Sequence, residues 1–168
     1  KTLYRMRRPS NIDWVHKTLG KMRSKISDLA IRTTFIVGYP GETDEEFETL
    51  LRFVNDMQFD RVGCFTYSFE PGTPSADLAD QVPQEIKERR RDALMSAQQP
   101  ISLARNQAQI GKTLDVMFEK PGRNERQFVG RSPYLHPVHA DGDAGLIGTI
   151  AKVRIEKRTA NSLHGVLI

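Results

Sequence analysis

The chain has 168 residues, a net charge of +4, 38% hydrophobic residues and 27% charged residues, which is ordinary composition for a globular protein of one or two domains. No apolar run approaches the roughly 18 residues that a membrane-spanning helix needs, so we expect no membrane partner. The single cysteine, Cys64, cannot form an internal disulfide, and this favours a reducing, cytoplasmic location.

The two ends of the chain suggest a carboxyl-terminal piece of a longer protein. Lys1 is not an initiator residue, and Leu3–Arg8 reads like the end of an element that is already under way. The last residues, GVLI, form a run typical of a strand. We therefore expect further structure upstream of Lys1.

Helices and strands alternate in the first part of the chain. The predicted elements are a helix capped by Ser10 or Asn11, strand Ile31–Val37, a helix capped by Thr43, strand Arg61–Tyr67, and a long helix with Pro83 in its first turn. Thr43 and Glu46 have the spacing of a capping box. Strands separated by such helices predict a parallel sheet, and two strands alone need cover from further strands.

The chain changes character near Gly111. Five short β-type runs separated by turn signals predict a small closed barrel: Thr113–Glu119, Gln127–Gly130, Leu135–Ala140, Ile147–Glu156 and Ser162–Ile168. We therefore divide the chain into an α/β domain, residues 1–106, and an all-β domain, residues 107–168. The second carries nine Lys or Arg and six Asp or Glu, a net charge of +3.

The turn Gly38–Glu42 is the most informative segment, because it links a strand to a helix at the edge where α/β sheets bind ligands. Such a turn can offer backbone N–H groups to an anion, or it can simply need glycine for its dihedral angles. The preceding strand places Arg32, Thr34, Ile36 and Gly38 on one face. This face either lines a cavity for a polar ligand or is a solvated strand end.

Three other groups have simpler interpretations. In the helix segment Glu85–Leu94, acidic residues balance the arginines, which favours a solvated helix face. His136 and His139 lack a third ligand nearby, so we predict no metal site, and Cys64 is expected to pack in a strand. No catalytic residue can be assigned.

The basic residues of the tail are candidates for binding a substrate or an RNA. Small barrels with basic and aromatic surfaces often bind single-stranded or looped RNA, and the alternative is a barrel that serves as a lid or spacer. The candidate contact residues are Lys112, Arg131, Arg154 and Arg158.

Several segments together resemble the methylthiotransferase branch of the radical SAM enzymes. They are RMRRP at 5–9, IRTTFIVGYPGETDEEF at 31–47, FDRVGCFTYSFEPGTPSADLADQVP at 59–83 and QQPISLARNQAQIGKTL at 98–114. The tail from Gly111 resembles the TRAM domain that ends those enzymes. The resemblance implies the later units of a radical SAM β/α barrel followed by a small TRAM barrel.

Two types within this branch remain open. The first two-thirds resemble the RimO type, which modifies an aspartate of a small-subunit ribosomal protein. The tail, with VGRSPYLHPVHADG at 129–142, resembles the MiaB type, which modifies an isopentenylated adenosine beside the tRNA anticodon. The implied partner is therefore the ribosomal protein as first choice or the tRNA anticodon loop, and a chimeric chain is a further alternative. A non-catalytic RNA-binding module is the alternative from another class.

The family chemistry needs S-adenosylmethionine and two 4Fe-4S clusters held by cysteines that are absent from this chain. The resemblance thus implies a full-length parent enzyme, and we expect this chain alone to be inactive. The strand that lines S-adenosylmethionine in the family falls on Thr34, Ile36 and Gly38. Arg32 shares their face, and Phe65 and Tyr67 would face the same cavity from the next strand.

Pro100 departs from the helical pattern of the family. A proline inside a helix removes a hydrogen bond and clashes with the preceding turn. We therefore predict that the long helix kinks or splits at this position.

Overall fold

The computed structural model describes all residues from 1 to 168, in two compact units, Lys1–Gln98 and Gln99–Ile168. The division falls within the long helix α4 (Gln84–Gln107). The first unit combines helices with a parallel sheet and the second contains a closed barrel. The predicted α/β class with a small β-barrel is confirmed, while the domain boundary at residues 106 and 107 stays a prediction.

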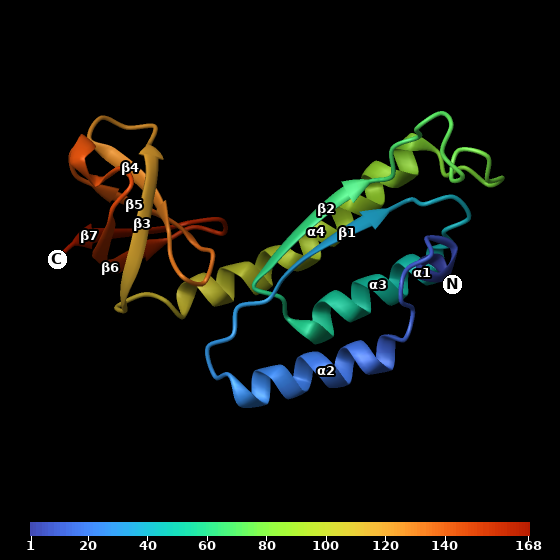
Figure 1. The fold of residues 1–168 in the computed structure, drawn as a ribbon, viewed down its shortest axis with the longest axis horizontal. Coiled ribbons are helices and arrows are strands. Elements are labelled where there is room, and N and C mark those ends of the chain that lie inside the picture. The colour runs from blue at the N-terminus through green and yellow to red at the C-terminus, as the bar shows by residue number, and fades with distance from the viewer. The chain divides into compact units, whose positions relative to one another are not determined.

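The first unit contains two strands and the helices around them (Figure 1). Its elements are α1 (Thr2–Arg5), α2 (Ile12–Lys25), β1 (Arg32–Val37), α3 (Asp44–Met57), β2 (Arg61–Thr66) and the first part of α4. β1 and β2 pair in parallel, from Arg32 opposite Arg61 to Val37 opposite Thr66. The predicted order of elements and the parallel pairing are confirmed.

Side-chain caps begin two of these helices. The Asn11 side chain accepts a hydrogen bond from the Trp14 backbone N–H, 2.9 Å, at the start of α2. At the start of α3, Thr43 and Glu46 form the predicted capping box, in which each side chain accepts a hydrogen bond from the other residue's backbone N–H. These bonds satisfy N–H groups that have no partner within the helix.

Aromatic rings connect the helices to β1. The ring of Phe35 lies edge-on to Phe53 of α3 and to Phe59, with centroids 6.3 Å and 6.0 Å apart. Phe53 also contacts the ring of His16 in α2, at 4.9 Å. Edge-to-face ring pairs add stability beyond that gained by burying the rings. Through these contacts, helices cover one face of β1.

The predicted apolar stripe of α2 is only partly covered. Val15 and Leu19 are half-buried, but Trp14, Met22 and Ile26 are exposed, and no residue of α2 is fully buried. The helical period is right, yet in this chain the helix contacts neighbours along only part of its apolar face.

Helix α4 begins next to Pro83, as predicted, and continues through Pro100. It starts at Gln84, directly after Pro83, whose carbonyl accepts the hydrogen bond of the Lys87 N–H at 3.1 Å. It then runs through Pro100 as one helix, so the helix does not split there, and the predicted alternative of a kink stays a prediction. Pro100 and Ser96, one turn earlier, are both exposed, so the Ser96 carbonyl, which loses its helical donor, lies on the side open to water.

None of the helices combines the length and apolar character that a membrane span needs.

The second unit is a closed five-stranded barrel. Its strands are β3 (Thr113–Pro121), β4 (Gln127–Arg131), β5 (Pro137–Asp141), β6 (Ile150–Arg158) and β7 (Leu163–Leu167), with a 3₁₀ turn, η1 (Ala144–Leu146), before β6. The order around the barrel is β3-β4-β5-β7-β6. All pairs are antiparallel except β5 with β7, which is parallel over only two residue pairs. All five predicted strands and the closed barrel are confirmed.

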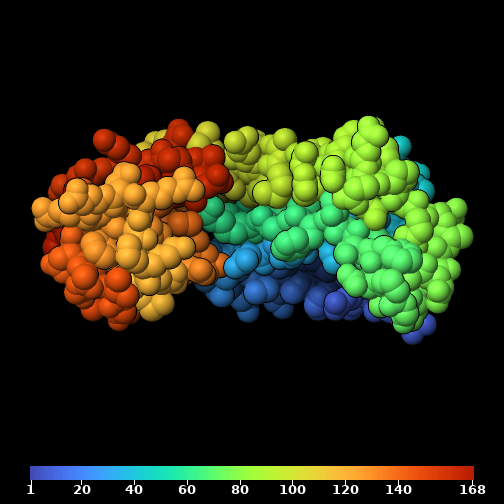
Figure 2. Space-filling view, turned by 90° about the horizontal axis from the view of Figure 1, so that it is seen from above, coloured from blue at the N-terminus to red at the C-terminus, as the bar shows by residue number.

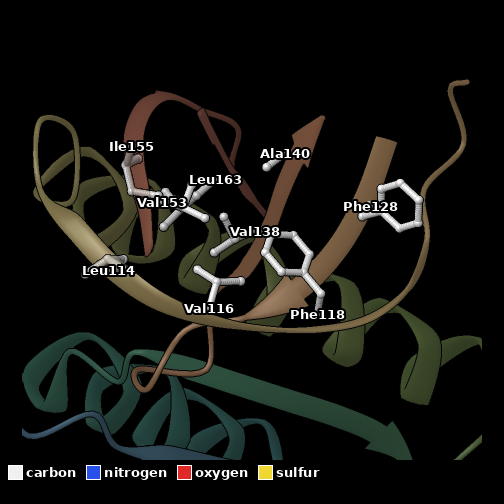
Figure 3. Packing of buried hydrophobic residues seen from close by; sticks show 9 residues of the cluster. All are labelled: Leu114, Val116, Phe118, Phe128, Val138, Ala140, Val153, Ile155 and Leu163. Atoms are coloured by element: carbon white, nitrogen blue, oxygen red, sulfur yellow. The ribbon is translucent and has the colours of Figure 1, made fainter. Parts of the chain in front are cut away.

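The barrel is filled by alternate residues of its strands (Figure 3). Along β3, Leu114, Val116 and Phe118 are buried while the residues between them are exposed. This alternation is the pattern from which the strands are predicted, because successive side chains point to opposite faces. The core residues are Leu114, Val116, Phe118, Phe128, Val138, Ala140, Val153, Ile155 and Leu163.

The end of α4 is fastened to the turn between β6 and β7. Asn106 is 1% exposed, and its Nδ2 donates to the carbonyls of Thr159, at 2.9 Å, and Ala160, at 3.1 Å. Just beyond the helix, the Gly111 N–H donates to the Ile155 carbonyl at 2.8 Å. These contacts join the helix end to the barrel within the second unit.

Gly165 gives a test of the barrel's packing. It pairs with Ile155 beside a register irregularity of β6, and a Cβ at this position would lie 2.2 Å from the Arg154 carbonyl oxygen. Because backbone cannot move aside cheaply, Gly165→Ala should lower the free energy of unfolding of the barrel by about 3 kcal/mol. Gly20→Ala, in open space on α2, should instead stabilise the first unit by about 1 kcal/mol. Urea unfolding of both variants checks this, and an unchanged barrel transition in Gly165→Ala would contradict the close approach.

Candidate functional site

The candidate site lies where β1 ends and the chain turns into α3. The turn Gly38–Glu42 follows β1, and Gly38 and Gly41 have φ angles of +74° and +73°, a conformation that favours glycine. Tyr39 and Pro40 between them are buried. The turn is therefore a covered structural element rather than an exposed loop.

Glu42 holds this turn from inside. It is 8% exposed, and its Oε1 accepts hydrogen bonds from the Gly38 N–H, at 2.9 Å, and from Arg90 Nη1, at 2.8 Å. Burial raises the pKa of Glu42 above its ordinary value, whereas the hydrogen bonds from Gly38 and Arg90 oppose the shift. A buried carboxylate with these donors is a rigid connection between the end of β1 and α4.

Arg90 of α4 supplies the counter-charge. Its side chain is 5% exposed, and it donates to the Glu42 carbonyl at 3.1 Å as well as to the carboxylate. Its Nη2 donates to Asp44 Oδ1 at 2.7 Å, and this hydrogen bond lowers the pKa of Asp44. The guanidinium also lies over the Phe47 ring, 5.6 Å from the centroid. One guanidinium thus links α4 to the end of the turn and to the start of α3.

Lys87, also on α4, holds the end of β2 as Arg90 holds the turn after β1. It is 6% exposed, and its Nζ donates to the Tyr67 carbonyl at 3.0 Å and lies 5.0 Å from the centre of the Tyr67 ring. That ring packs edge-on against Tyr39, with centroids 5.3 Å apart. The Lys87 stem also packs on Gly38, where an added Cβ would lie 2.4 Å from Lys87 Cγ.

The predicted solvated face for Glu85–Leu94 is therefore wrong for two of its cations. Glu88 and Arg89 are exposed, but Lys87 and Arg90 are buried. Lys87, Arg90 and Leu94 are spaced at the helical period, and this spacing is the sequence signal that could have predicted one buried face. A search for apolar stripes misses such a face because two of its members are charged.

Arg5 contacts the turn from α1. Its Nη2 donates to the Gly41 carbonyl at 2.9 Å and to Glu46 Oε2 at 2.7 Å. Burial alone would raise the pKa of Glu46, but hydrogen bonds from Arg5, Thr43 and Thr2 lower it to about 2. The Arg5 guanidinium is thus paired with the Glu46 carboxylate of its own chain.

Four of the predicted cofactor-binding residues lie together on the exposed face of the sheet. Arg32, Thr34 and Ile36 are exposed along β1, and Phe65 is exposed on β2. Ile36 pairs in register with Phe65, and Thr34 pairs with Gly63. Ile36 is 43% exposed and Phe65 63%, so two large apolar side chains lie uncovered beside a hydroxyl and a guanidinium.

The other two predicted cofactor-binding residues, Gly38 and Tyr67, are buried. Gly38 lies beneath Lys87, and Tyr67 is 9% exposed between Tyr39 and Lys87. The Oη atom of Tyr67 is buried without a hydrogen-bond partner. Direct contact of all six residues with a cofactor stays a prediction.

The basic residues of the barrel lie beside acidic ones. Arg131 Nε lies 3.2 Å from Glu119 Oε1, and Arg154 Nη2 lies 3.1 Å from Glu156 Oε1. Such exposed pairs contribute little stability, but each neutralises the local charge. Two of the four predicted contact residues therefore do not form a free basic surface.

The remaining two differ from each other. Arg158 is half-buried and donates from Nε to Gln107 Oε1 at 2.9 Å, whereas Lys112 is exposed. Lys152 of the barrel, like Arg131 and Arg154, is paired with a carboxylate, that of Asp115, at 3.0 Å. The structure does not join Lys112, Arg131, Arg154 and Arg158 into one unpaired basic patch.

The histidines of the tail are structural neighbours of other side chains. His136 is 2% exposed, and its Nδ1 lies 3.2 Å from Ser132 Oγ. His139 stacks on His164, a residue that no sequence pattern indicated, with centroids 4.7 Å apart and planes inclined by 12°. No group of three or more His, Cys, Asp or Glu side chains is placed to hold a metal ion.

Comparison with known proteins identifies the barrel. A family model described as TRAM domain matches residues 107–168. The second unit carries a TRAM domain. This match accords with the closed five-stranded barrel.

The whole chain is similar to methylthiotransferases. It is 45% identical to the ribosomal protein uS12 methylthiotransferase RimO of Herpetosiphon aurantiacus, over 99% of this chain and 37% of that protein. The corresponding proteins of Chloroflexus aurantiacus and Thermosynechococcus vestitus are 44% and 41% identical, over 98% and 96% of the chain. The chain is a relative of the RimO methylthiotransferases, and it spans less than two-fifths of their length.

The stacked pair His139–His164 gives the barrel a predicted pH dependence. Burial, His164 and Arg123 lower the pKa of His139 in the folded state, so the unfolded chain takes up its proton at a higher pH. Stability should be greatest above the ordinary histidine pKa of about 6.5 and should fall as the pH drops through that value towards the folded pKa. His139→Gln should flatten this dependence, and His164→Gln should reduce it less. Thermal melts of the three proteins between pH 7.5 and 5 check this prediction (roughly the histidine range). An identical slope in His139→Gln and the wild type would contradict it.

Proposed function

We propose that this chain forms the carboxyl-terminal part of a RimO-type methylthiotransferase that modifies ribosomal protein uS12 at an aspartate. The observation that carries the proposal is the 45% identity to a uS12 methylthiotransferase over 99% of the chain. In this proposal β1 and β2 are later units of a radical SAM barrel, and the enzyme acts in the cytoplasm. Activity belongs to a longer protein, because the relatives are more than twice as long as the chain.

The charge distribution of the barrel supports a protein substrate over an RNA. Proteins that bind nucleic acid use cations that are free to displace counterions from phosphates. In this barrel Arg131, Arg154 and Lys152 are each paired with a carboxylate. The tRNA-modifying MiaB type and the stand-alone RNA-binding module are therefore less well supported than the uS12 enzyme.

We assign the exposed face of the sheet to S-adenosylmethionine. Ile36 and Phe65 provide neighbouring apolar surface for a planar base, and the Thr34 hydroxyl and the Arg32 guanidinium lie on the same face. When bound, S-adenosylmethionine supplies the radical chemistry that the family resemblance implies. The residues of this chain would hold and orient its adenosine.

The iron–sulfur clusters of the family do not fit this chain. Cys64 is its single cysteine, and burial raises the pKa of that thiol to about 11. A thiol that stays protonated is a poor ligand for iron, since the thiolate is the metal-binding form. Cluster ligands would have to come from another part of the proposed enzyme.

A segment exchange tests the proposed function. The matching carboxyl-terminal segment of the Herpetosiphon relative is replaced by this chain, and the hybrid is assayed with uS12 by mass spectrometry of the modified peptide. We expect the hybrid to methylthiolate uS12, because the two segments are 45% identical over nearly the whole chain. The unaltered relative and a version cut before the segment are the positive and negative controls. A folded hybrid that leaves uS12 unmodified but modifies tRNA would contradict the proposal in favour of the MiaB type.

A further inference from the structure

We propose that Lys87 and Arg90 are positioning residues, which fix the carboxyl ends of β1 and β2 and thereby the spacing of Ile36 and Phe65 on the exposed face. We call Lys87 and Arg90, with their contacts, the α4 clamp. The functional meaning of the clamp rests on the proposed function, because that proposal assigns the exposed face to the cofactor. The clamp itself rests on contacts within the first unit.

One helix reaches both strand ends. Lys87 and Arg90 are three residues apart, so they lie on the same side of α4. Arg90 contacts Glu42 in the turn that follows β1, whereas Lys87 contacts the carbonyl of Tyr67 just after β2. Figure 2 shows α4, in yellow-green, lying along β2, in green. A rigid helix with two anchors therefore sets the two strand ends relative to each other.

The anchors act directly on backbone groups of the strand ends. The Gly38 N–H donates to Glu42, which Arg90 holds, and the Lys87 stem leaves no room for a Cβ on Gly38. The Tyr67 N–H donates to the Val37 carbonyl at 2.8 Å, which links the two strand ends to each other. Gly38 is thus held from the side of Glu42 and from the side of Lys87.

The positions of two exposed residues follow from these anchors. Ile36 precedes Gly38 by two residues, and Phe65 precedes Tyr67 by two residues. Ile36 and Phe65 are also paired in register. A shift of either anchored end moves one of the pair relative to the other, so the clamp sets the width of the apolar surface.

Burial of charge argues that the clamp positions rather than merely stabilises. Lys87 is 6% exposed, and the partners of its ammonium group are a carbonyl and an aromatic ring. Removing an ammonium from water is costly, and apolar replacement of buried charges is often neutral or stabilising. A methionine of similar length would pack in this space but could not hold the Tyr67 carbonyl.

Amide hydrogen exchange in the 168-residue chain tests the clamp. Lys87→Met and Arg90→Met should speed exchange at the Gly38 and Tyr67 amides by at least about tenfold, while amides of α3 such as Val54 change much less. Arg89→Met, on the exposed side of the same helix, should leave both amides unchanged. Arg90→Lys should restore part of the protection, because an ammonium group can still reach Glu42.

A second variant guards against loss of folding. Arg90→Met leaves the Glu42 carboxylate buried without its counter-ion, so Glu42→Gln with Arg90→Met removes the charge as well. Exchange that rises equally in all amides of the first unit, or at none, would overturn the positioning role. The exchange pattern needs no cofactor, so failure of the proposed function and failure of the clamp are seen separately.

Discussion

The hydrogen-bonded pair of Glu42 and Arg90 is the contact on which the end of the sheet depends. The carboxylate caps the buried carboxyl end of β1 through the Gly38 N–H, and the guanidinium ties that carboxylate to α4 and to Asp44. Taking two charges out of water is expensive, and this is offset only when several hydrogen bonds satisfy them. Here four hydrogen bonds link the Glu42 carboxylate and carbonyl, the Gly38 N–H, Asp44 and the two Nη groups of Arg90, and they fix the glycine-rich turn at the end of β1.

This fixed edge matters because the sheet is unusual. Parallel sheets normally have both faces covered, yet the face with Ile36 and Phe65 is open in this chain. The aromatic packing of Phe35, Phe53 and Phe59 covers the opposite face. With cover on one side alone, the geometry of the open face depends on the strand ends, which Lys87 and Arg90 hold.

The sequence predicted most of the fold because the deciding interactions are local. The barrel strands follow from the alternation seen at Leu114, Val116 and Phe118, and the start of α3 follows from the spacing of Thr43 and Glu46. Each of these signals spans only a few neighbouring residues. The order of the strands around the barrel, such as the parallel pairing of β5 with β7, needed the structure.

The candidate site was harder to predict because its contacts are distant in sequence. Arg90 binds Glu42 and Asp44, which are 48 and 46 residues away, whereas neighbouring charges along the helix suggested local neutralisation. The carboxylate opposite Arg131, Glu119, likewise comes from another strand, whereas Arg154 pairs with Glu156 two residues along β6. Four of the six predicted cofactor residues share an exposed face, and strand alternation, a local signal, predicted this. Gly38 and Tyr67 are instead covered by a helix, which strand alternation cannot predict.

In the proposed enzyme, the α4 clamp builds a cofactor face from β1 and β2. A titration of the isotope-labelled chain with S-adenosylhomocysteine, followed by NMR, tests it most directly. We expect chemical-shift changes centred on Thr34, Ile36 and Phe65 that weaken in Lys87→Met and persist in Arg89→Met. Shifts confined to the barrel, or the same shifts in all three proteins, would contradict it.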